Sequence, residues 1–464
     1  MPRMTVQNGA LAWGVLSLLL ASTPWVGCAA PDAPEARAAD GGGTEGAGRT
    51  DDDAAGPDVL GDAGSSMDGA SITGDADALE SATRDSGSRG WITGDYSYGD
   101  ICTVPPSQLD YAEVSHIMHF HLDIVDQSPY WAFPCPAEEG AGMACTSNAA
   151  AQAEFETGAG YCASAFPAQA DLIRLAHASG VKVFLAIQSA PDSQTGIDPL
   201  AAVTLDSGKL QVMVSTILTY AQSRGYDGID LDWEPPASAE GFIALMTALR
   251  AGLDAWSPRG LLATDVYCQP WSSVPFDVPT LNADDDQVNL MCYNLSSMQS
   301  AATGYNAPLD QSACSACGTD QNCYNIADMV PLWLAAGLDK RKMGLGVPFY
   351  GWKWSGYSAP CQKVADFGAM AYVYQPLATV QGLGLQQNWD GTSQVPWSAG
   401  TDSNGTPFFL TYDDARSIQA KAEFAQQQGL GGMMIWSLFS GFVPQADGGS
   451  AQPLLDSLAT SYWQ

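Results

Sequence analysis

The stretch from Asp227 to Glu234, Asp-Gly-Ile-Asp-Leu-Asp-Trp-Glu, carries four acidic residues, the last three of them two positions apart. Apolar residues alternate with the acidic ones, which predicts a β-strand over 228–233. Residues two apart in a strand point to the same face, so Asp230, Asp232 and Glu234 form one row. Ionised neighbours repel one another, so at least one of the three must have a raised pKa and hold a proton. A carboxylic acid of this kind can act as a general acid near neutral pH.

Other roles for the acidic row have less support. Interleaved Ile, Leu and Trp residues and the bounding Pro235-Pro236 argue against a solvated patch. Closely spaced carboxylates also suit magnesium, but no phosphate-handling loop or basic partner accompanies this row. Asp227 has the opposite parity, and we expect it at the start of the strand with a structural or turn role.

A second possible reaction class is metal-dependent hydrolysis. His119 and His121 form a His-x-His on one predicted strand, but such a site needs further His or Asp ligands, and the chain holds four His in total. The simpler interpretation is that these two residues line a groove or form hydrogen bonds inside the fold. We therefore expect no metal and no cofactor.

The elements that must position the acidic row alternate along the chain. Eight apolar runs of strand length are separated by longer segments, several of them with the three- and four-residue apolar spacing of amphipathic helices. This alternation predicts an α/β fold, a (β/α)8 TIM barrel. A doubly wound open sheet is the alternative, but no Gly-x-Gly-x-x-Gly follows an early strand. The predicted strands are 91–94, 117–122, 181–187, 228–233, 261–266, 288–293, 343–349 and 432–436, and the clearest helices are 169–178, 210–223, 239–256 and 415–428.

Two insertions follow the sixth and seventh predicted strands, around 296–321 and 352–406, at the barrel face where such enzymes build their sites. The second is expected to be small. It contains a group of residues that either line a sugar groove or form the insertion's own core: Trp389, Asp390, Pro396 and Trp397.

The charge balance limits the possible partners. Eighteen basic residues against fifty-one acidic ones give a net charge of −33, which excludes a partner held through its phosphates, such as nucleic acid. A neutral substrate fits this balance. Charge repulsion also favours a soluble protein, which we expect to be a monomer.

The N-terminal region has the composition of a targeting segment. An apolar run of thirteen residues, 10–22, is too short to span a bilayer but suits a signal peptide. Trp25-Val26-Gly27-Cys28 follows and is similar to a bacterial lipobox, so we expect residues 1–28 to be a signal peptide with Cys28 as the lipidated residue. The alternative is an ordinary secretory signal cleaved near Ala29 or Ala30. Either way the protein is exported, and only a lipid anchor would hold it to a membrane.

Residues 29–88 differ sharply from the rest. Ala, Gly, Asp and Ser dominate, with fourteen Asp and Glu against three Arg. Such a segment cannot bury enough apolar surface to offset its ordering entropy, so we expect a disordered acidic linker. The folded, catalytic part is then expected to be 89–464.

The cysteines indicate an oxidising compartment. Eleven are present, and setting Cys28 aside leaves ten, an even number that favours disulfides in an exported protein. A zinc site at Cys314-x-x-Cys317 lacks a second Cys-x-x-Cys and a nearby His. Cys268 and Cys292 lie in predicted strands and are either bonded or simply buried.

Several motifs resemble one known family. The acidic stretch resembles the fourth-strand signature Asp-x-x-Asp-x-Asp-x-Glu of family-18 glycoside hydrolases, the chitinase family. Residues 287–294, Gln-Val-Asn-Leu-Met-Cys-Tyr-Asn, are similar to the sixth-strand Met-x-Tyr-Asp element. Residues 346–351, Gly-Val-Pro-Phe-Tyr-Gly, resemble the seventh strand, and 412–436 resemble the run into the eighth. The resemblance spans roughly residues 90–438, essentially the whole predicted folded part.

This resemblance implies a retaining mechanism in which the substrate's own acetamido group, and not an enzyme carboxylate, is the nucleophile. By motif position, Glu234 protonates the leaving oxygen and later activates water. Asp232 orients the acetamido group, and Asp230 shares a proton with Asp232. Tyr293 hydrogen-bonds the acetamido oxygen, and Trp436 forms the floor beneath the −1 sugar.

Three further residues lie in elements that line this sugar in the family, and we expect them to contact substrate: Tyr96, Met291 and Asn294. The sequence also departs from the family there. Gly94-Asp95-Tyr96 stands where Gly-Tyr-Tyr is common, Asn294 replaces Asp, and the third strand ends in Ala186-Ile187-Gln188-Ser189 instead of Ser-x-Gly-Gly.

The expected substrate is a β-1,4-linked N-acetylglucosamine glycan, either chitin or a chito-oligosaccharide. Two alternatives stay open. One is an endo-β-N-acetylglucosaminidase acting on N-glycans. The other is a non-catalytic, lectin-like chitin-binding relative, although such relatives typically lose the terminal Glu of the motif and Glu234 is present here.

Overall fold

The computed structural model of the chain describes residues 89–97, 104–123, 165–189, 198–270, 276–296, 300, 302–310, 324–364, 372–445 and 450–464. The expected signal peptide, Cys28 and the linker 29–88 lie outside the described residues. So do seven of the other cysteines, at positions 102, 135, 145, 162, 314, 317 and 323.

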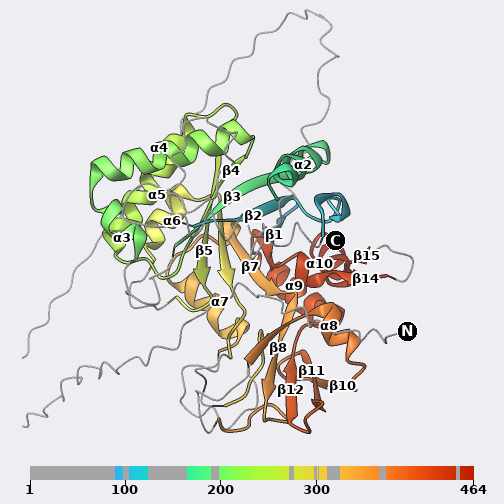
Figure 1. Cartoon of the computed structure of the whole chain (residues 1–464). Coiled ribbons are helices and arrows are strands. Elements are labelled where there is room, and N and C mark those ends of the chain that lie inside the picture. Colours follow the sequence, from blue (N-terminus) through green and yellow to red (C-terminus); the bar gives the residue numbers. More distant parts are fainter. Residues whose placement is uncertain are drawn as a thin grey trace, which may run out of the picture. The chain divides into compact units, whose positions relative to one another are not determined.

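Eight parallel strands close into a barrel (Figure 1). The chain order is followed around the barrel, and β13 closes it between β7 and β1. The predicted (β/α)8 barrel is therefore confirmed, and the open doubly wound sheet is wrong. The barrel strands are β1 (Trp91–Ser97), β2 (His116–Asp123), β3 (Lys182–Ser189), β4 (Gly228–Trp233), β5 (Leu261–Tyr267), β6 (Gln287–Met291), β7 (Met343–Pro348) and β13 (Gly432–Trp436).

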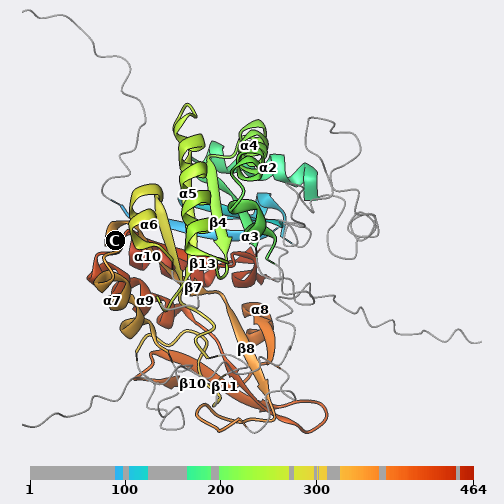
Figure 2. The same cartoon turned by 90° about the vertical axis from the view of Figure 1, so that its left-hand side faces the viewer.

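Helices surround the barrel, and α4, α5 and α6 cover the side near β3 to β5 in both ribbon views (Figures 1 and 2). Their ends follow from local sequence: Asp206 caps the start of α4, and Gly225 ends it in a left-handed conformation with φ 87°. None of the described helices is long and apolar enough to cross a membrane. The helices are α2 (Ala165–Ala178), α3 (Pro199–Thr204), α4 (Ser207–Arg224), α5 (Ala239–Asp254), α6 (Val278–Asp284), α7 (Ile326–Ala335), α8 (Leu377–Gly382), α9 (Ala415–Gln428) and α10 (Pro453–Tyr462).

Smaller elements complete the described part of the chain. Three are short 3-10 helices and two form a separate antiparallel pair. They are η2 (Pro106–Gln108), η4 (Lys340–Lys342), η5 (Phe439–Gly441), β14 (Val443–Pro444) and β15 (Ser450–Ala451).

The insertion after β7 is a five-stranded antiparallel sheet, seen below the barrel in Figures 1 and 2. One face buries Trp354 and Phe409 against Tyr305 from the segment that follows β6. The other face packs Phe408 and Leu410 with α8. The strands are β8 (Tyr350–Ser355), β9 (Tyr372–Pro376), β10 (Gln387–Asp390), β11 (Val395–Thr401) and β12 (Pro407–Thr411).

The aromatic and polar residues of this insertion mostly serve its own packing. The Trp389 ring lies 3.7 Å from the Arg416 guanidinium, and the carboxylate of Asp390 accepts a hydrogen bond from the Tyr305 hydroxyl at 3.0 Å. Pro396 is buried, and Trp397 packs on Phe409. Of the two roles left open by the sequence, these contacts favour the insertion's own core.

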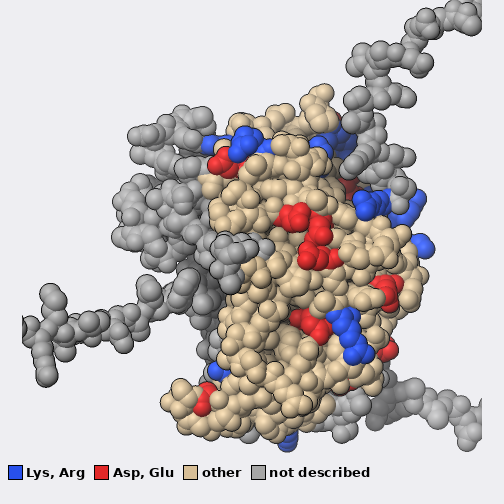
Figure 3. Space-filling model, turned by 90° about the vertical axis from the view of Figure 1, so that its right-hand side faces the viewer, with Lys and Arg blue, Asp and Glu red and all other residues tan. Residues whose placement is uncertain are grey.

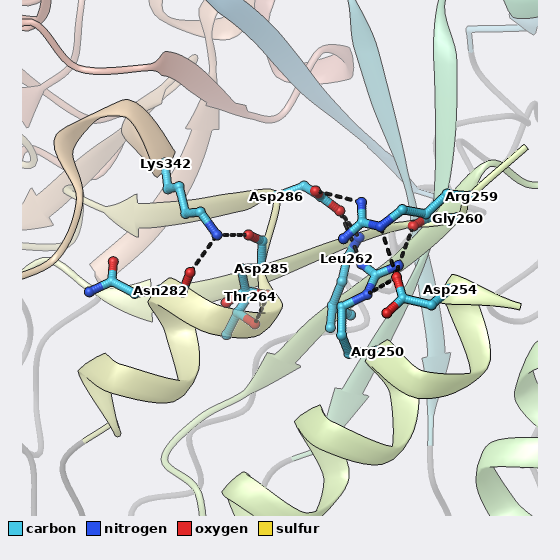
Figure 4. Close-up of polar contacts among 10 residues, drawn as sticks. All are labelled: Arg250, Asp254, Arg259, Gly260, Leu262, Thr264, Asn282, Asp285, Asp286 and Lys342. Atoms are coloured by element: carbon cyan, nitrogen blue, oxygen red, sulfur yellow. Dashed lines mark hydrogen bonds and ion pairs between the residues drawn. The ribbon is translucent and has the colours of Figure 1, made fainter.

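A network of ion pairs joins the N-terminal ends of β5 and β6 to α5 (Figure 4). Arg250 of α5, whose side chain is 7% exposed, lies 2.8 Å from Asp254 and 3.1 Å from Asp286, and it donates to the Gly260 carbonyl at 2.7 Å. Arg259 contacts the same two carboxylates at 2.8 and 2.9 Å. Asp254 and Asp286 are thus matched by arginines, whereas Asp285 at the same end is buried, accepts a hydrogen bond from the Thr264 hydroxyl at 3.1 Å and has a pKa raised well above its ordinary value by burial.

Charged residues on the surface face drawn in Figure 3 form small groups separated by uncharged side chains. That face carries no continuous basic patch among the described residues. Phosphate backbones bind to clustered Lys and Arg, so this face does not have the charge pattern of a nucleic-acid surface.

Candidate active site

The acidic row lies at the C-terminal end of β4, inside the barrel. Ile229, Leu231 and Trp233 pack in the apolar core outside the barrel wall, so the residues between them face the barrel axis. Asp230 is fully buried and Asp232 is 2% exposed, while Glu234 is half-buried just past the strand end. The chain therefore buries a row of carboxyl groups where a barrel enzyme places its chemistry.

Asp230 is the deepest member of the row. Neither of its carboxyl oxygens has a hydrogen-bond partner among the described residues. Burial raises its pKa well above the ordinary value, and the nearby charges of Asp232 and of Asp95 on β1 raise it further. Asp230 is therefore held in its neutral, protonated form.

Glu234 also retains a proton. Burial raises its pKa well above the ordinary value, followed by the charge of Asp232 and a hydrogen bond to that residue. Two carboxyl groups can form this hydrogen bond only when one of them is protonated. The pair therefore favours one protonated and one ionised member.

Asp232 is the member best suited to carry the negative charge. Burial raises its pKa, but the hydrogen bond with Glu234, the charge of His121 and a hydrogen bond from Gln188 all lower it. The Gln188 amide Nε2 donates to Asp232 Oδ2 at 3.1 Å. The arrangement therefore favours a protonated Glu234 beside an ionised Asp232, which suits acid catalysis with a neighbouring anion.

Tyr293 reaches the same site from the end of β6. It is 8% exposed, and its ring centroid lies 6.2 Å from that of Tyr350. Burial raises the pKa of its hydroxyl, as do the charges of Asp265 and then of Glu234 and Asp232, which keeps the hydroxyl a hydrogen-bond donor. Cys292, directly before it, forms a disulfide with Cys268 at the end of β5. Of the two options for these cysteines, the bonded one is confirmed.

Three other residues expected at the site are found there. Met291 and Trp436 both pack against the interior cluster that contains Tyr293, and the Trp436 ring meets Phe120 edge-on at 4.7 Å. Asn294 has a left-handed backbone, with φ 57°, which Asn tolerates better than most residues. Its Oδ1 accepts hydrogen bonds from the Tyr350 hydroxyl at 2.6 Å and the Trp352 indole at 2.8 Å.

Tyr96 is not at the site, which corrects the expected substrate contact. It is fully buried in the core outside the barrel, and its hydroxyl donates to the Val104 carbonyl. Alternation along β1 turns Asp95 inward and Tyr96 outward. The expected contact therefore fails by one position along β1, because Asp95 and not Tyr96 faces the barrel interior.

Asp227, the first acidic residue of the motif, lies at the opposite end of β4. Its carboxylate accepts hydrogen bonds from Lys182 Nζ at 2.8 Å and the Val183 amide at 2.9 Å, and it pairs with His177 at 2.7 Å. These contacts join β3, β4 and α2 far from the acidic row. They agree with the structural role predicted for this residue.

The two histidines considered for a metal site do not converge. His119 is buried outside the barrel wall, where a ring nitrogen lies 2.7 Å from the Tyr226 hydroxyl, and burial lowers its pKa to about 3. His121 acts electrostatically on Asp232. Within the described part of the chain, no three His, Cys, Asp or Glu side chains are arranged to hold a metal.

Several residues at the site were missed from the sequence. Asp265 on β5 is buried beside the acidic row, accepts a hydrogen bond from Asn289 at 3.1 Å and has a pKa raised well above its ordinary value by burial and by Asp230. The pKa of Tyr267 is raised by burial and then by the charges of Glu234 and Asp232. The alternation of Ala263, Asp265 and Tyr267 along β5 was the available signal. Gln188, a departure from the family's third-strand pattern, also belongs to the site, because its amide donates to Asp232.

A parallel barrel with a row of carboxyl groups at the C-terminal end of one strand is the arrangement found in a class of glycoside-cleaving barrel enzymes. The family model of glycosyl hydrolases family 18 matches residues 110–441, more than half of the chain. The chain therefore belongs to glycosyl hydrolases family 18.

Similar proteins include chitinases from distant organisms. Chitinase A1 of Niallia circulans is 27% identical over 258 residues, which are 49% of this chain and 36% of that protein. Chitotriosidase-1 of Mus musculus is 28% identical over 256 residues, 49% of this chain and 52% of that protein. This chain thus matches about half or less of the length of these relatives.

Solved structures show the same fold. The Group IV chitinase of Ostrinia furnacalis superimposes with a TM-score of 0.64 at 20% identity, over 81% of this chain and all of that one. The class V chitinase of Nicotiana tobaccum in complex with NAG4 gives a TM-score of 0.60 at 17% identity, over 81% of this chain and 99% of that one.

Proposed function

We propose that the protein is a retaining glycoside hydrolase that cleaves β-1,4-linked N-acetylglucosamine glycans, that is, chitin or chito-oligosaccharides. The single observation that carries the proposal is the pair of Asp232 and Glu234, which belong to one row of side chains at the C-terminal end of β4, facing the barrel axis. Such a pair supplies a proton donor and an anion within one strand, as substrate-assisted hydrolysis requires.

In this mechanism Glu234 donates its proton to the glycosidic oxygen as the bond to the anomeric carbon breaks. The acetamido carbonyl oxygen of the −1 sugar attacks that carbon and forms an oxazolinium ion. Asp232, ionised, accepts the acetamido N–H and stabilises the positive charge. Glu234, now a carboxylate, then takes a proton from water as the water attacks the anomeric carbon and opens the ring with net retention.

The other site residues have supporting roles in this proposal. The Tyr293 hydroxyl donates to the acetamido oxygen, and Trp436 provides an apolar floor beneath the −1 sugar. Asp230 keeps a proton and limits the charge beside Asp232. Met291 and Asn294 contact the sugar from the sixth strand. No cofactor is involved.

The similar proteins support the substrate class. The relatives matched include chitinases, and one structural neighbour was solved with NAG4 and another with allosamidin. Glu234 is present at the end of the motif, which favours an enzyme over a lectin-like binding protein.

The test is turnover of chitotetraose by the purified full chain, with a Glu234→Gln variant as control. We expect cleavage whose first-formed product is the β-anomer, seen by proton NMR within minutes of mixing, and no cleavage by the variant. Binding without turnover by both proteins would contradict the proposal. A parallel panel of N-glycans, read by mass spectrometry, separates the chitin substrate from the N-glycan alternative.

We further propose that the protein is exported as a monomer anchored through lipidated Cys28, with residues 29–88 as a flexible acidic tether. The Cys268–Cys292 disulfide supports an oxidising compartment. Expression in a bacterial host with a labelled fatty acid tests this. We expect label on the wild type and none on Cys28→Ser. Soluble, unlabelled wild-type protein would indicate an ordinary secretory signal.

A further inference from the structure

Gln188 stands beside the catalytic pair without a role in the mechanism above. It lies near the end of β3, where its Cα is the register partner of Asp232 on β4. Side chains at paired positions of neighbouring strands point to the same side of the sheet. Both therefore face the barrel interior, and the Gln188 amide reaches Asp232 Oδ2 at 3.1 Å.

The direction of this hydrogen bond is fixed by chemistry. An ionised carboxylate only accepts hydrogen bonds, so the Gln188 amide must turn its Nε2 toward Asp232. Gln188 makes no other side-chain hydrogen bond in the described part of the chain, and its side chain is half-buried.

The groups around Asp232 are mostly acidic, which explains why a hydrogen-bond donor is important at this carboxylate. Groups from four other barrel strands and from its own strand act on this part of the barrel, and all but one of them are acidic or phenolic. The exception is His121 on β2, which favours the ionised form. The acidic and phenolic groups are Asp95, Asp230, Glu234, Asp265, Tyr267 and Tyr293, and Asp285 before β6 and Tyr350 of β8 act in turn on Asp230 and Tyr293.

A carboxylate that is 2% exposed among other carboxyl groups tends to take up a proton. A protonated Asp232 could neither stabilise a cationic intermediate nor share the proton of Glu234. Hydrogen bonds donated to the charged form oppose this protonation, and the Gln188 amide donates one at every pH.

We propose that Gln188 is a positioning residue that keeps Asp232 ionised and turned toward Glu234 during glycoside cleavage. This inference rests on the proposed function. Gln188 replaces the first Gly of the Ser-x-Gly-Gly pattern common in the family. The side chain therefore adds a contact to Asp232 that glycine cannot make.

The experiment compares two variants of the full chain, Gln188→Met and Gln188→Glu, by pH–rate profiles with chitotetraose. Met keeps the length and removes the donor, and Glu replaces the donor by a further acidic group. We expect kcat/KM of Gln188→Met to fall about 10- to 100-fold, mostly in kcat, because a hydrogen bond to a charged group is lost.

The pH profile distinguishes a positioning role from a merely structural one. Loss of the donor makes Asp232 easier to protonate, so the acid-side midpoint of kcat/KM moves to higher pH in Gln188→Met and further in Gln188→Glu. Gln427→Met, an exposed change on α9, is the matched control and should keep the wild-type profile.

The outcomes separate the two proposals. An inactive wild type overturns the proposed function itself. An active wild type with an unshifted acid midpoint in both Gln188 variants overturns only the role of Gln188. A rate loss with unchanged midpoints and a lowered melting temperature would likewise assign Gln188 to folding and overturn this inference.

Discussion

The two ends of the barrel differ in whether their carboxyl groups are paired with Lys or Arg. At the N-terminal end, Arg250 and Arg259 share Asp254 and Asp286, and Lys182 pairs with Asp227. At the C-terminal end, no described Lys or Arg pairs with the carboxyl groups of the site, namely the buried Asp230, Asp232 and Asp265 and the half-buried Glu234.

This difference separates stability from chemistry within one fold. Carboxylates paired with Lys or Arg hold strands and helices together. Buried carboxyl groups without a cation retain protons that can be transferred. The motif from Asp227 to Glu234 spans both ends, so one stretch of chain contains a paired carboxylate, Asp227, and three carboxyl groups without a cation.

The sharpest test compares substitutions of the first and last residues of that motif. Glu234→Gln should lower kcat at least about 1000-fold, because it removes the general acid, with little loss of stability. Asp227→Asn should keep kcat within about twofold and destabilise the fold by about 1–2 kcal/mol, because it weakens hydrogen bonds to a charged group. Chitotetraose kinetics and urea unfolding of both variants measure this. A stable but inactive Asp227→Asn would break the comparison.

The ion-pair network should affect folding alone. Arg250→Met leaves Asp286 and the Gly260 carbonyl without their buried partner, and we expect a loss of about 2–3 kcal/mol in the free energy of unfolding. The rate constant kcat should stay within about twofold of wild type. Arg259→Met, a change at a half-exposed side chain, should cost less than about 1 kcal/mol and serves as the control. Equal losses in both variants would contradict the importance of burial.

The two tyrosines distinguish the inward from the outward face of the barrel. Tyr293→Phe should lower kcat about 10- to 100-fold, because it removes a hydrogen bond to the charged intermediate. Tyr96→Phe should leave kcat unchanged and cost about 1 kcal/mol of stability, because only the bond to the Val104 carbonyl is lost. Steady-state kinetics and thermal unfolding give both values. A catalytic defect in Tyr96→Phe would restore the original expectation for that residue.

The carboxyl groups without a Lys or Arg partner at the C-terminal end should also determine how the stability of the fold depends on pH. Burial raises the pKa of Asp230, Glu234 and Asp265, so the folded protein keeps protons that the unfolded chain has lost above about pH 4. The free energy of unfolding therefore falls as pH rises from about 4 through the raised pKa values. Asp230→Asn should flatten this slope and gain about 1 kcal/mol at pH 8. Urea titrations at several pH values check it, and an unchanged slope would contradict it.

The barrel and its acidic row could be predicted because both are periodic. Alternation of apolar and acidic residues sets the parity of β4, and the strand–helix alternation sets the fold. The outward position of Tyr96 needed the register of β1, where a shift of one residue exchanges the two faces.

Other features depend on closure of the barrel and leave little trace in the sequence. Asp265 is one acid in an otherwise apolar strand, and it joins the site only because β5 lies beside β4. The Cys268–Cys292 bond likewise requires neighbouring strand ends, with Cα atoms 4.6 Å apart. The contact of Gln188 with Asp232 depends on the pairing of two strands that are far apart in the chain.

The hydrogen bonds of Asn294 set the polarity of recognition on one side of the site. An indole N–H can only donate, so the bond from Trp352 fixes the amide oxygen of Asn294 toward the protein. The amide NH₂ group of this exposed side chain is then left facing outward. A glycan that reaches it would be bound through an oxygen lone pair and not through a hydroxyl proton, and that preference would not change across the pH range in which carboxylates titrate.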